Sequence, residues 1–196
     1  ADEILGTVSN IKSDDKVYLV TGDRDCFQLI NDNTNVCFLC GKKAKSEGYT
    51  LYGKEDFETE YGFEPEHIID LKALMGDSSD NIPGVKGIGE KTALQLIQKY
   101  RDINTILSNP NNLDCTQTVK NKLFEGKESA EFSYWLATIK QDVPLDLDNP
   151  PQFNIKSQKL LELFHKMGFR KFIREWNFSN TEVQTLPEDG ENFSLF

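Results

Sequence analysis

The spacing of apolar residues predicts both helices and strands in the first part of the chain. Helical spacing over 1–11 is followed by an apolar run over 16–21, which has the character of a buried strand in a parallel sheet. A helix is expected to open over 26–30. Two short strands are predicted over 36–39 and 49–52, on either side of a basic loop that we interpret as a solvated hairpin tip. The pattern favours an α/β fold.

Helical patterns dominate from residue 54 onward. The expected helices cover 54–61, 64–75, 90–100 and 103–107, and two more flank Gly126. Pro65 suits a first helical position, Gly76 a C-terminal stop, and Asp102 an N-cap. Pro65 and Asp102 thus mark the expected start of a helix, and Gly76 marks the expected end of one.

Aromatic residues are frequent in the later helices. We expect Phe132 and Trp135 in the core rather than as base-stacking platforms, because they recur at helical spacing with other apolar residues. An amphipathic unit from Leu160 to Ile173 follows, and the polar, acidic segment 181–196 is expected to fray.

Composition sets limits on the class of protein. The 196 residues, 38% of them hydrophobic, are enough for one core or two small ones. No apolar run approaches the ~18 residues that a membrane span needs, and no signal peptide is visible. We expect a protein of the cytoplasm, at the bacterial nucleoid, or of an organellar matrix, and not a secreted one.

The four cysteines do not form a disulfide framework, which favours a reducing compartment. Cys37 and Cys40 form one Cys-x-x-Cys pair, but His67 is distant in sequence and no second pair follows. Because structural zinc normally takes four ligands, a buried strand with two small apolar side chains is the preferred interpretation.

The net charge of −10 argues against nucleic-acid binding, but the charge is unevenly distributed. Segment 81–101 contains four cations and only Glu90 as an anion. Segment 155–176 contains six cations: Lys156, Lys159, Lys166, Arg170, Lys171 and Arg174. They face only Glu162 and Glu175, so the acidic total does not exclude a nucleic-acid partner.

Residues 76–93 combine two chemistries in the stretch Gly-Asp-Ser-Ser-Asp-Asn-Ile-Pro-Gly-Val-Lys-Gly-Ile-Gly-Glu-Lys-Thr-Ala. Asp77 and Asp80 offer oxygen ligands to a hard cation. The glycines that follow let backbone N–H groups approach a phosphate at the start of a helix. A plain turn is the alternative, but the order of small and apolar residues favours the hairpin of a helix-hairpin-helix module.

Asp23 and Asp25 follow the first predicted strand, where residues of open α/β sheets line a ligand crevice. An EF-hand is excluded, because its sixth and twelfth positions would be Gln28 and Thr34 rather than Gly and Glu. These two aspartates are therefore candidate cation ligands.

The stretches 1–3 (Ala-Asp-Glu), 21–25 (Thr-Gly-Asp-Arg-Asp) and 76–93 resemble, in the same order, the motifs of the structure-specific 5′ nucleases. These are the 5′-3′ exonuclease domain of DNA polymerase I and the flap endonucleases. The resemblance extends to about residue 178. It implies part of a PIN-like (resolvase-like), mostly parallel sheet with flanking helices, followed by a helix-3-turn-helix region.

The resemblance also implies a division of the chain. We expect the C-terminal part of the catalytic domain over 1–75, the helix-hairpin-helix region over 76–140, a closing helical segment over 141–178, and a flexible tail over 179–196.

The resemblance assigns roles to residues at the matching positions. The metal ligands it implies, most of them also catalytic, are Asp2, Glu3, Asp23, Asp25, Asp77 and Asp80, with Glu3 at a position where relatives usually carry Asp. The implied DNA-binding residues are Asn81, Gly84, Lys86, Gly87, Ile88, Gly89, Lys91 and Thr92. Main-chain carbonyls of Val85 and Ile88 are the expected monovalent-cation ligands. The implied cofactors are two Mg²⁺ or Mn²⁺ ions, and K⁺ at the hairpin.

The implied activity is metal-dependent 5′-3′ exonuclease and 5′-flap endonuclease cleavage of DNA in replication and repair, including removal of Okazaki-fragment primers. The substrate would be DNA with a 5′ flap, a nick or a free 5′ end. The family's N-terminal segment, with its Glu ligand before Ala1 and its helical arch, has no counterpart in this sequence. We therefore expect this chain alone to bind metal weakly and to need that segment as a partner. The alternative is a non-catalytic DNA-binding module that retains the hairpin.

Overall fold

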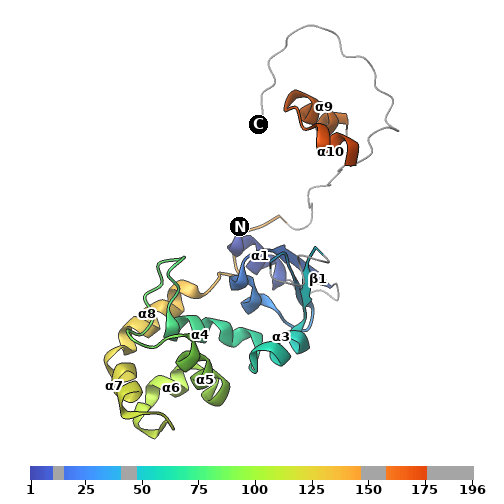
Figure 1. Cartoon of the computed structure of the whole chain (residues 1–196). Helices are drawn as coiled ribbons and strands as arrows, with labels where there is room; N and C mark the ends of the chain where they lie inside the picture. Colours follow the sequence, from blue (N-terminus) through green and yellow to red (C-terminus); the bar gives the residue numbers. More distant parts are fainter. Residues whose placement is uncertain (11–15, 41–47, 147–157, 176–196) are drawn as a thin grey trace. The chain divides into compact units, whose positions relative to one another are not determined.

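The computed structural model describes residues 1–10, 16–40, 48–146 and 158–175. It divides the chain into two compact units, Ala1–Leu145 and Asp146–Phe196, which are described separately (Figure 1). The predicted loop tip at 41–47 and the tail from 181 lie outside the described residues. The finer division expected at residues 75, 140 and 178 stays a prediction.

The first unit has the α/β composition that the sequence predicts. Its α-helices are α1 (Asp2–Ser9), α3 (Lys54–Tyr61), α4 (Ile68–Met75), α5 (Glu90–Tyr100), α6 (Ile103–Ser108), α7 (Gln117–Glu125) and α8 (Lys127–Ala137). Short 3₁₀ helices are η1 (Arg24–Leu29), η2 (Pro65–His67) and η3 (Pro110–Asn112). The helix ends predicted from Gly76, Gly126 and Asp102 are confirmed, and Asp102 accepts the Thr105 N–H at 2.8 Å.

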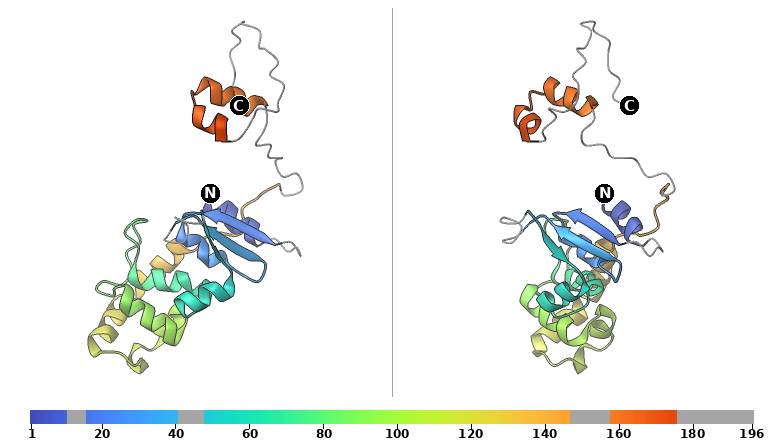
Figure 2. Two further views of the ribbon diagram at one scale, coloured as in Figure 1. Left: turned by 45° about the vertical axis from the view of Figure 1, so that its right-hand side comes forward. Right: turned by 90° about the vertical axis from the view of Figure 1, so that its right-hand side faces the viewer.

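The sheet contains β1 (Val17–Thr21), β2 (Thr34–Phe38) and β3 (Thr50–Tyr52) in the order β1-β2-β3 (Figure 2). β1 and β2 are parallel, whereas β3 runs antiparallel to β2. The carboxyl ends of β1 and β2 therefore lie at the same end of the sheet, and the residues after β1 begin there.

The segment after β1 differs from the prediction of a helix that opens at Cys26. It forms the 3₁₀ helix η1 from Arg24, because the Asp23 carboxylate accepts the Asp25 N–H at 2.9 Å and caps the turn early. The buried Gln28 side chain then donates to the Ala137 carbonyl at 3.0 Å and accepts the Ile139 N–H at 2.9 Å. These long-range bonds fix η1 against the end of α8.

One apolar core extends from the sheet into the helices. The ring of Phe27 lies at its centre, with the rings of Phe38, Tyr52, Phe57 and Tyr61 at centroid distances between 4.9 and 6.1 Å. Helix α4 packs between η1 and the helices α5 and α8 (Figure 1), and even its polar residues are buried. Side chains at the end of α4 are therefore held in fixed positions.

The expectation that Phe132 and Trp135 belong to the core is wrong, since they are 53% and 68% exposed. Helix α8 instead buries a stripe of small residues, Ala130, Ser133 and Ala137. Small side chains allow α8 to approach α4 closely, and the aromatic residues lie on its other face. Phe132 and Trp135 stack on each other with their ring centroids 6.0 Å apart.

The second unit contains α9 (Gln158–Lys166) and α10 (Arg170–Glu175), which pack against each other. Leu161 and Phe164 are buried between them, as the amphipathic pattern predicts. Met167, Phe169 and Phe172 are more than 40% exposed, so the closing unit buries fewer apolar residues than expected. None of the helices described combines the length and apolar character of a membrane-spanning segment.

Candidate metal centre and nucleic-acid interface

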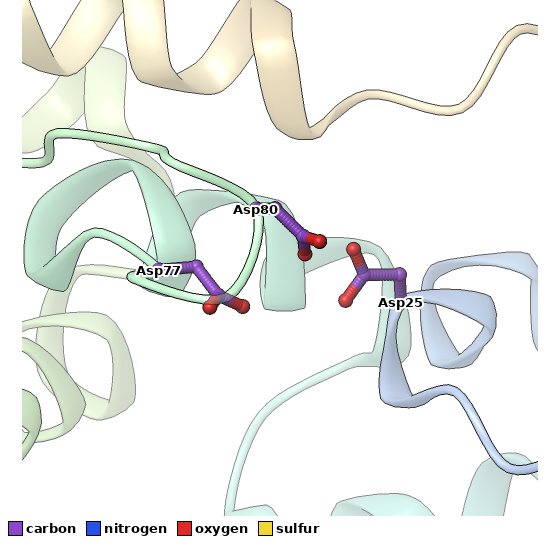
Figure 3. Close-up of side chains that lie close together, drawn as sticks. All are labelled: Asp25, Asp77 and Asp80. Carbon is purple, nitrogen blue, oxygen red and sulfur yellow. The ribbon is translucent and has the colours of Figure 1, made fainter.

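Three of the predicted ligands come together from two distant parts of the chain. Asp25 lies in η1, after β1, and Asp77 and Asp80 lie in the turn after α4 (Figure 3). Each offers a carboxylate oxygen, and these oxygens all lie within 4.8 Å of one another. Within the described ranges, no other three acidic, cysteine or histidine side chains meet this criterion.

The turn that carries Asp77 and Asp80 is defined by its backbone. Gly76 has a φ of +75°, which ends α4 and reverses the chain. Asp77 and Ile82 then exchange backbone hydrogen bonds of 2.9 and 2.8 Å. The Asp77 carboxylate also accepts the Ser79 N–H at 2.9 Å. These bonds aim both aspartates toward η1.

A lysine that was not among the predicted site residues lies among the three carboxylates. Lys72 of α4 donates to Asp25 and to Asp77, the latter at 2.7 Å, and its Nζ is 3.8 Å from Asp80. Its side chain is only 8% exposed. A charged residue inside the apolar helix 68–75, five positions before Asp77, is the sequence signal for this contact.

The environment shifts the pKa values of these groups in different directions. Burial raises the pKa of Asp25 above its ordinary value, although the hydrogen bond from Lys72 opposes this effect. The Lys72 hydrogen bond lowers the pKa of Asp77 to about 2. Burial acts to lower the pKa of Lys72, but its bonds to Asp25 and Asp77 outweigh burial and raise it. Lys72 is therefore a charged counter-ion at neutral pH.

Asp2, Glu3 and Asp23 do not join this group of three. Asp2 and Glu3 are exposed in the first turn of α1, and Asp23 caps η1. Asp2 and Asp23 nevertheless lie close enough to Cys26 to act on it: the pKa of the Cys26 thiol is raised to about 11, first by burial and then by the charges of Asp2, Asp23 and Asp25. Their assignment as metal ligands stays a prediction.

The Cys37 and Cys40 pair is not gathered with other potential zinc ligands among the described residues. Both are free thiols, with Cys37 partly buried in β2 and Cys40 exposed.

The glycine-rich segment forms a tight turn that leads into α5. Val85 and Ile88 are 2% and 3% exposed and pack inward, as the sequence predicts. Gly84 and Gly87 have φ values of +62° and +82°, and the Ile88 N–H bonds to the Val85 carbonyl at 3.0 Å. A side chain at Gly84 would meet the backbone of Gly76, with its Cβ 2.2 Å from the Gly76 nitrogen. The turn that carries Asp77 and Asp80 and this glycine turn therefore pack backbone against backbone.

Side chains of α7 and α8 form hydrogen bonds with the backbone of the glycine turn. The Ser133 hydroxyl accepts the Gly84 N–H at 2.9 Å, and the Ser129 hydroxyl donates to the Gly84 carbonyl at 2.6 Å. Lys122 donates to the Gly87 carbonyl at 2.8 Å. The three side chains lie more than 30 residues downstream in sequence, and no local motif indicated them.

The predicted DNA-binding residues differ in exposure. Those that are exposed are Asn81, Lys86, Gly87, Gly89 and Lys91; Thr92 is half-buried, and Gly84 and Ile88 are buried. Gly89 is the N-cap of α5, and a Cβ at this position would meet no atom within 4 Å. The exposed members form an open surface at the N-terminus of a helix, which is a favourable place for an anion.

Comparison with known proteins identifies the family of the chain. The family described as 5′-3′ exonuclease, C-terminal SAM fold, matches residues 63–160. A 5′-3′ exonuclease of Bacillus subtilis (strain 168) is 45% identical over 147 residues, which cover 74% of this chain and 48% of the relative. DNA polymerase I of Bacillus caldotenax is 35% identical over 188 residues, 94% of this chain and 21% of the polymerase.

A solved structure shows the same architecture. T5 5′-exonuclease with bound divalent metal ions (zinc) superimposes with a TM-score of 0.57 and 26% identity, covering 69% of this chain and 48% of the exonuclease. The predicted PIN-like α/β fold is thereby confirmed. The chain spans about half the length of the exonucleases it matches. With half of its residues matched by the family and similar relatives over most of its length, the chain belongs to the 5′-3′ exonuclease family.

Proposed function

We propose that this protein acts in metal-dependent hydrolysis of DNA phosphodiesters, as a 5′-3′ exonuclease and 5′-flap endonuclease of replication and repair. The observation that carries the proposal is the group Asp25, Asp77 and Asp80, whose carboxylate oxygens lie within 4.8 Å of one another. Asp77 and Asp80 directly precede the glycine turn in sequence. Three carboxylates beside a phosphate-binding surface would repel DNA unless a cation is bound between them.

The residues present fit a divalent metal. Lys72 places its ammonium group among the three carboxylates, and this arrangement supports the proposal that their oxygens can surround a cation. Carboxylate oxygens suit Mg²⁺ or Mn²⁺. Asp2 would hold one ion, with Glu3 at the acidic position beside it, and Asp23, Asp25, Asp77 and Asp80 would hold the other. Such ions supply an activated water and neutralise charge on the scissile phosphate.

The glycine turn and the start of α5 would hold the DNA backbone. Gly89 leaves open space in front of the helix N-terminus, and Lys86 and Lys91 are exposed beside it. Contacts of this kind position a duplex without reading its bases. The carbonyls of Val85 and Ile88 are the proposed K⁺ ligands. Phosphates bound here would orient the substrate relative to the adjoining carboxylates.

The sheet offers a place for a further segment of the same protein. In the described sheet β1 is an edge strand, and Tyr18 and Val20 on it are 55% and 61% exposed. An exposed strand edge with apolar side chains is a template for another strand. We propose that the N-terminal segment of this family pairs here and completes the catalytic site. The complete enzyme would act where DNA is replicated, in the nucleoid or an organellar matrix.

The test is cleavage of a 5′-flap DNA in Mg²⁺ by this chain, alone and fused to the N-terminal half of the Bacillus subtilis relative. We expect efficient cleavage by the fusion only. Asp80→Asn should abolish cleavage, because it removes one of the three proposed carboxylate ligands. Asp80 is 52% exposed, so the substitution should not unfold the protein. Asp102→Asn is the matched control, since Asp102 caps α6 outside the site.

Two results would overturn the proposal. One is a fusion that binds flap DNA but does not cut it with all carboxylates intact, which favours a non-catalytic DNA-binding module. The other is cleavage that survives Asp80→Asn, which would place the chemistry elsewhere.

A further inference from the structure

Helices α9 and α10 present a concentration of positive charge that the proposed site does not use. Five cations occur among residues 158–175, and all are exposed: Lys159, Lys166, Arg170, Lys171 and Arg174. Only Glu162 and Glu175 oppose them in this segment. The excess is pronounced because the whole chain has a net charge of −10.

Little of this charge is neutralised among the described residues 158–175. Across residues 158–175 as described, the one ion pair joins Lys171 to Glu175 at 3.7 Å, and both side chains are more than half exposed. Exposed pairs of this kind are weak. Arg170 and Arg174 are four positions apart on α10, and Lys166 ends α9. The cations therefore remain available to an external anion.

The unit has an internal frame that holds these residues in place. Leu161 and Phe164 are buried between the helices, and the ring of Phe164 lies 5.9 Å from that of Phe169 and 5.7 Å from that of Phe172. Gly168, with a φ of +70°, makes the tight turn from α9 to α10. Lys166 and Arg170 are thus carried on either side of a defined turn rather than on an extended tail.

We propose that α9 and α10 form a second DNA-binding surface, which contacts the phosphate backbone through Lys166, Arg170 and Arg174. The inference rests on the proposed function, because the partner is the DNA that the nuclease site would cut. Guanidinium groups match phosphate oxygens in shape and charge. A second contact on the same chain strengthens binding to a DNA long enough to reach both surfaces.

Exposed apolar side chains lie on the same unit, and by themselves they do not distinguish a nucleic acid from a membrane as the partner. Met167, Phe169 and Phe172 are 56%, 41% and 43% exposed beside the cations. A basic surface with aromatic rings is typical of nucleic-acid contacts, where rings stack on unpaired bases. It also occurs in helices that lie on anionic membranes. The proposed function already supplies DNA as a charge-complementary partner, and membrane binding is an outcome of the test.

The experiment compares the affinity of the chain for a labelled 5′-flap duplex, measured by fluorescence anisotropy across KCl concentrations without Mg²⁺. The test variant combines Lys166→Gln, Arg170→Gln and Arg174→Gln. The matched control removes three exposed charges of the first unit that lie outside the predicted DNA-binding set, through Lys16→Gln, Lys54→Gln and Lys140→Gln. Lys91→Gln is measured in parallel to report on the hairpin.

We expect the test variant to lose affinity by about tenfold or more at low salt, with a salt slope smaller by about 0.9 for each lost phosphate contact. The control should change neither quantity to this extent. If only Lys91→Gln weakens binding, the second surface is refuted while the proposed function stands. Binding of the same variants to phosphatidylglycerol vesicles is measured in parallel. If the test variant loses affinity for the vesicles but not for DNA, the surface binds membranes and the proposed second DNA contact is refuted. If no variant changes DNA binding, the proposed function fails as well.

Discussion

Replacing Lys72 by methionine tests whether this lysine balances the charge of the candidate metal centre. Methionine keeps most of the length and the apolar stem of the side chain but removes the ammonium group. The variant leaves Asp25, Asp77 and Asp80 with oxygens within 4.8 Å of one another and no counter-ion between them. We therefore expect the protein to be less stable without metal and to gain more from Mg²⁺ than the wild type gains.

The size of the effect follows from the exposure of the partners. Breaking a fully buried ion pair costs about 3–5 kcal/mol, whereas an exposed pair contributes about 0–1 kcal/mol. Lys72 is 8% exposed, Asp25 and Asp77 are 18% and 19% exposed, and Asp80 is 52% exposed. The site thus lies nearer the buried limit, and we expect a loss of about 2–3 kcal/mol. This corresponds to a fall of about 1 M in the urea midpoint at an unchanged slope.

The assay is urea unfolding followed by circular dichroism, in EDTA and again in Mg²⁺. Lys99→Met is the control, because Lys99 pairs with Asp114 in an exposed ion pair, and its loss should change the midpoint little. Mg²⁺ should restore the Lys72→Met variant by mass action. Equal midpoints for the variant and the wild type in EDTA would refute the counter-ion role, as would an equal gain from Mg²⁺ in both.

Four further predictions concern the glycine turn and the turn that carries Asp77. Gly84→Ala should destabilise the protein by about 3 kcal/mol or more in urea unfolding, because its Cβ would lie 2.2 Å from a backbone nitrogen at a φ of +62°. Gly89→Ala meets no atom within 4 Å and should keep its stability but weaken DNA binding in anisotropy measurements; an unchanged affinity would contradict the proposed approach of phosphate. Ser133→Ala leaves the buried Gly84 N–H unpaired and should cost about 1–3 kcal/mol, against no comparable loss for the exposed Ser108→Ala. The pKa of Asp77 in the folded protein is about 2, below its ordinary 3.8, so its contribution to the free energy of unfolding is complete above pH 3.8 and is lost as the pH falls toward 2. The urea midpoint of Asp77→Asn should lack this part of the acid dependence.

Much of the local structure is encoded in short-range signals. The ends of α4 and α7 coincide with Gly76 and Gly126, and α6 begins after its predicted cap Asp102. These signals act within a turn of the chain, so the sequence alone reveals them. The 3₁₀ form of η1 was not predicted, because the cap at Asp23 and the bonds of Gln28 to residues more than 100 positions away decide it.

The sequence reveals three side chains of the candidate site but not their environment. Asp25, Asp77 and Asp80 were identified from motifs, and the structure brings them together. Lys72 was missed, because a single lysine in an apolar helix does not reveal which carboxylates surround it. The exposure of Trp135 was missed for a related reason. Helical periodicity shows that a helix has an apolar stripe but not which of two stripes meets its neighbour.

The hydrogen bonds of the Ser129 and Ser133 hydroxyls to Gly84 affect the order in which the protein folds during synthesis. During synthesis the glycine turn emerges 45 to 49 residues before the side chains that hold it. Its backbone groups at Gly84 must stay hydrated until α8 has left the ribosome and packed against α4. The turn that would bind DNA is therefore finished late in folding, and a nascent chain that ends before α8 has no formed DNA-binding surface to engage nucleic acid prematurely.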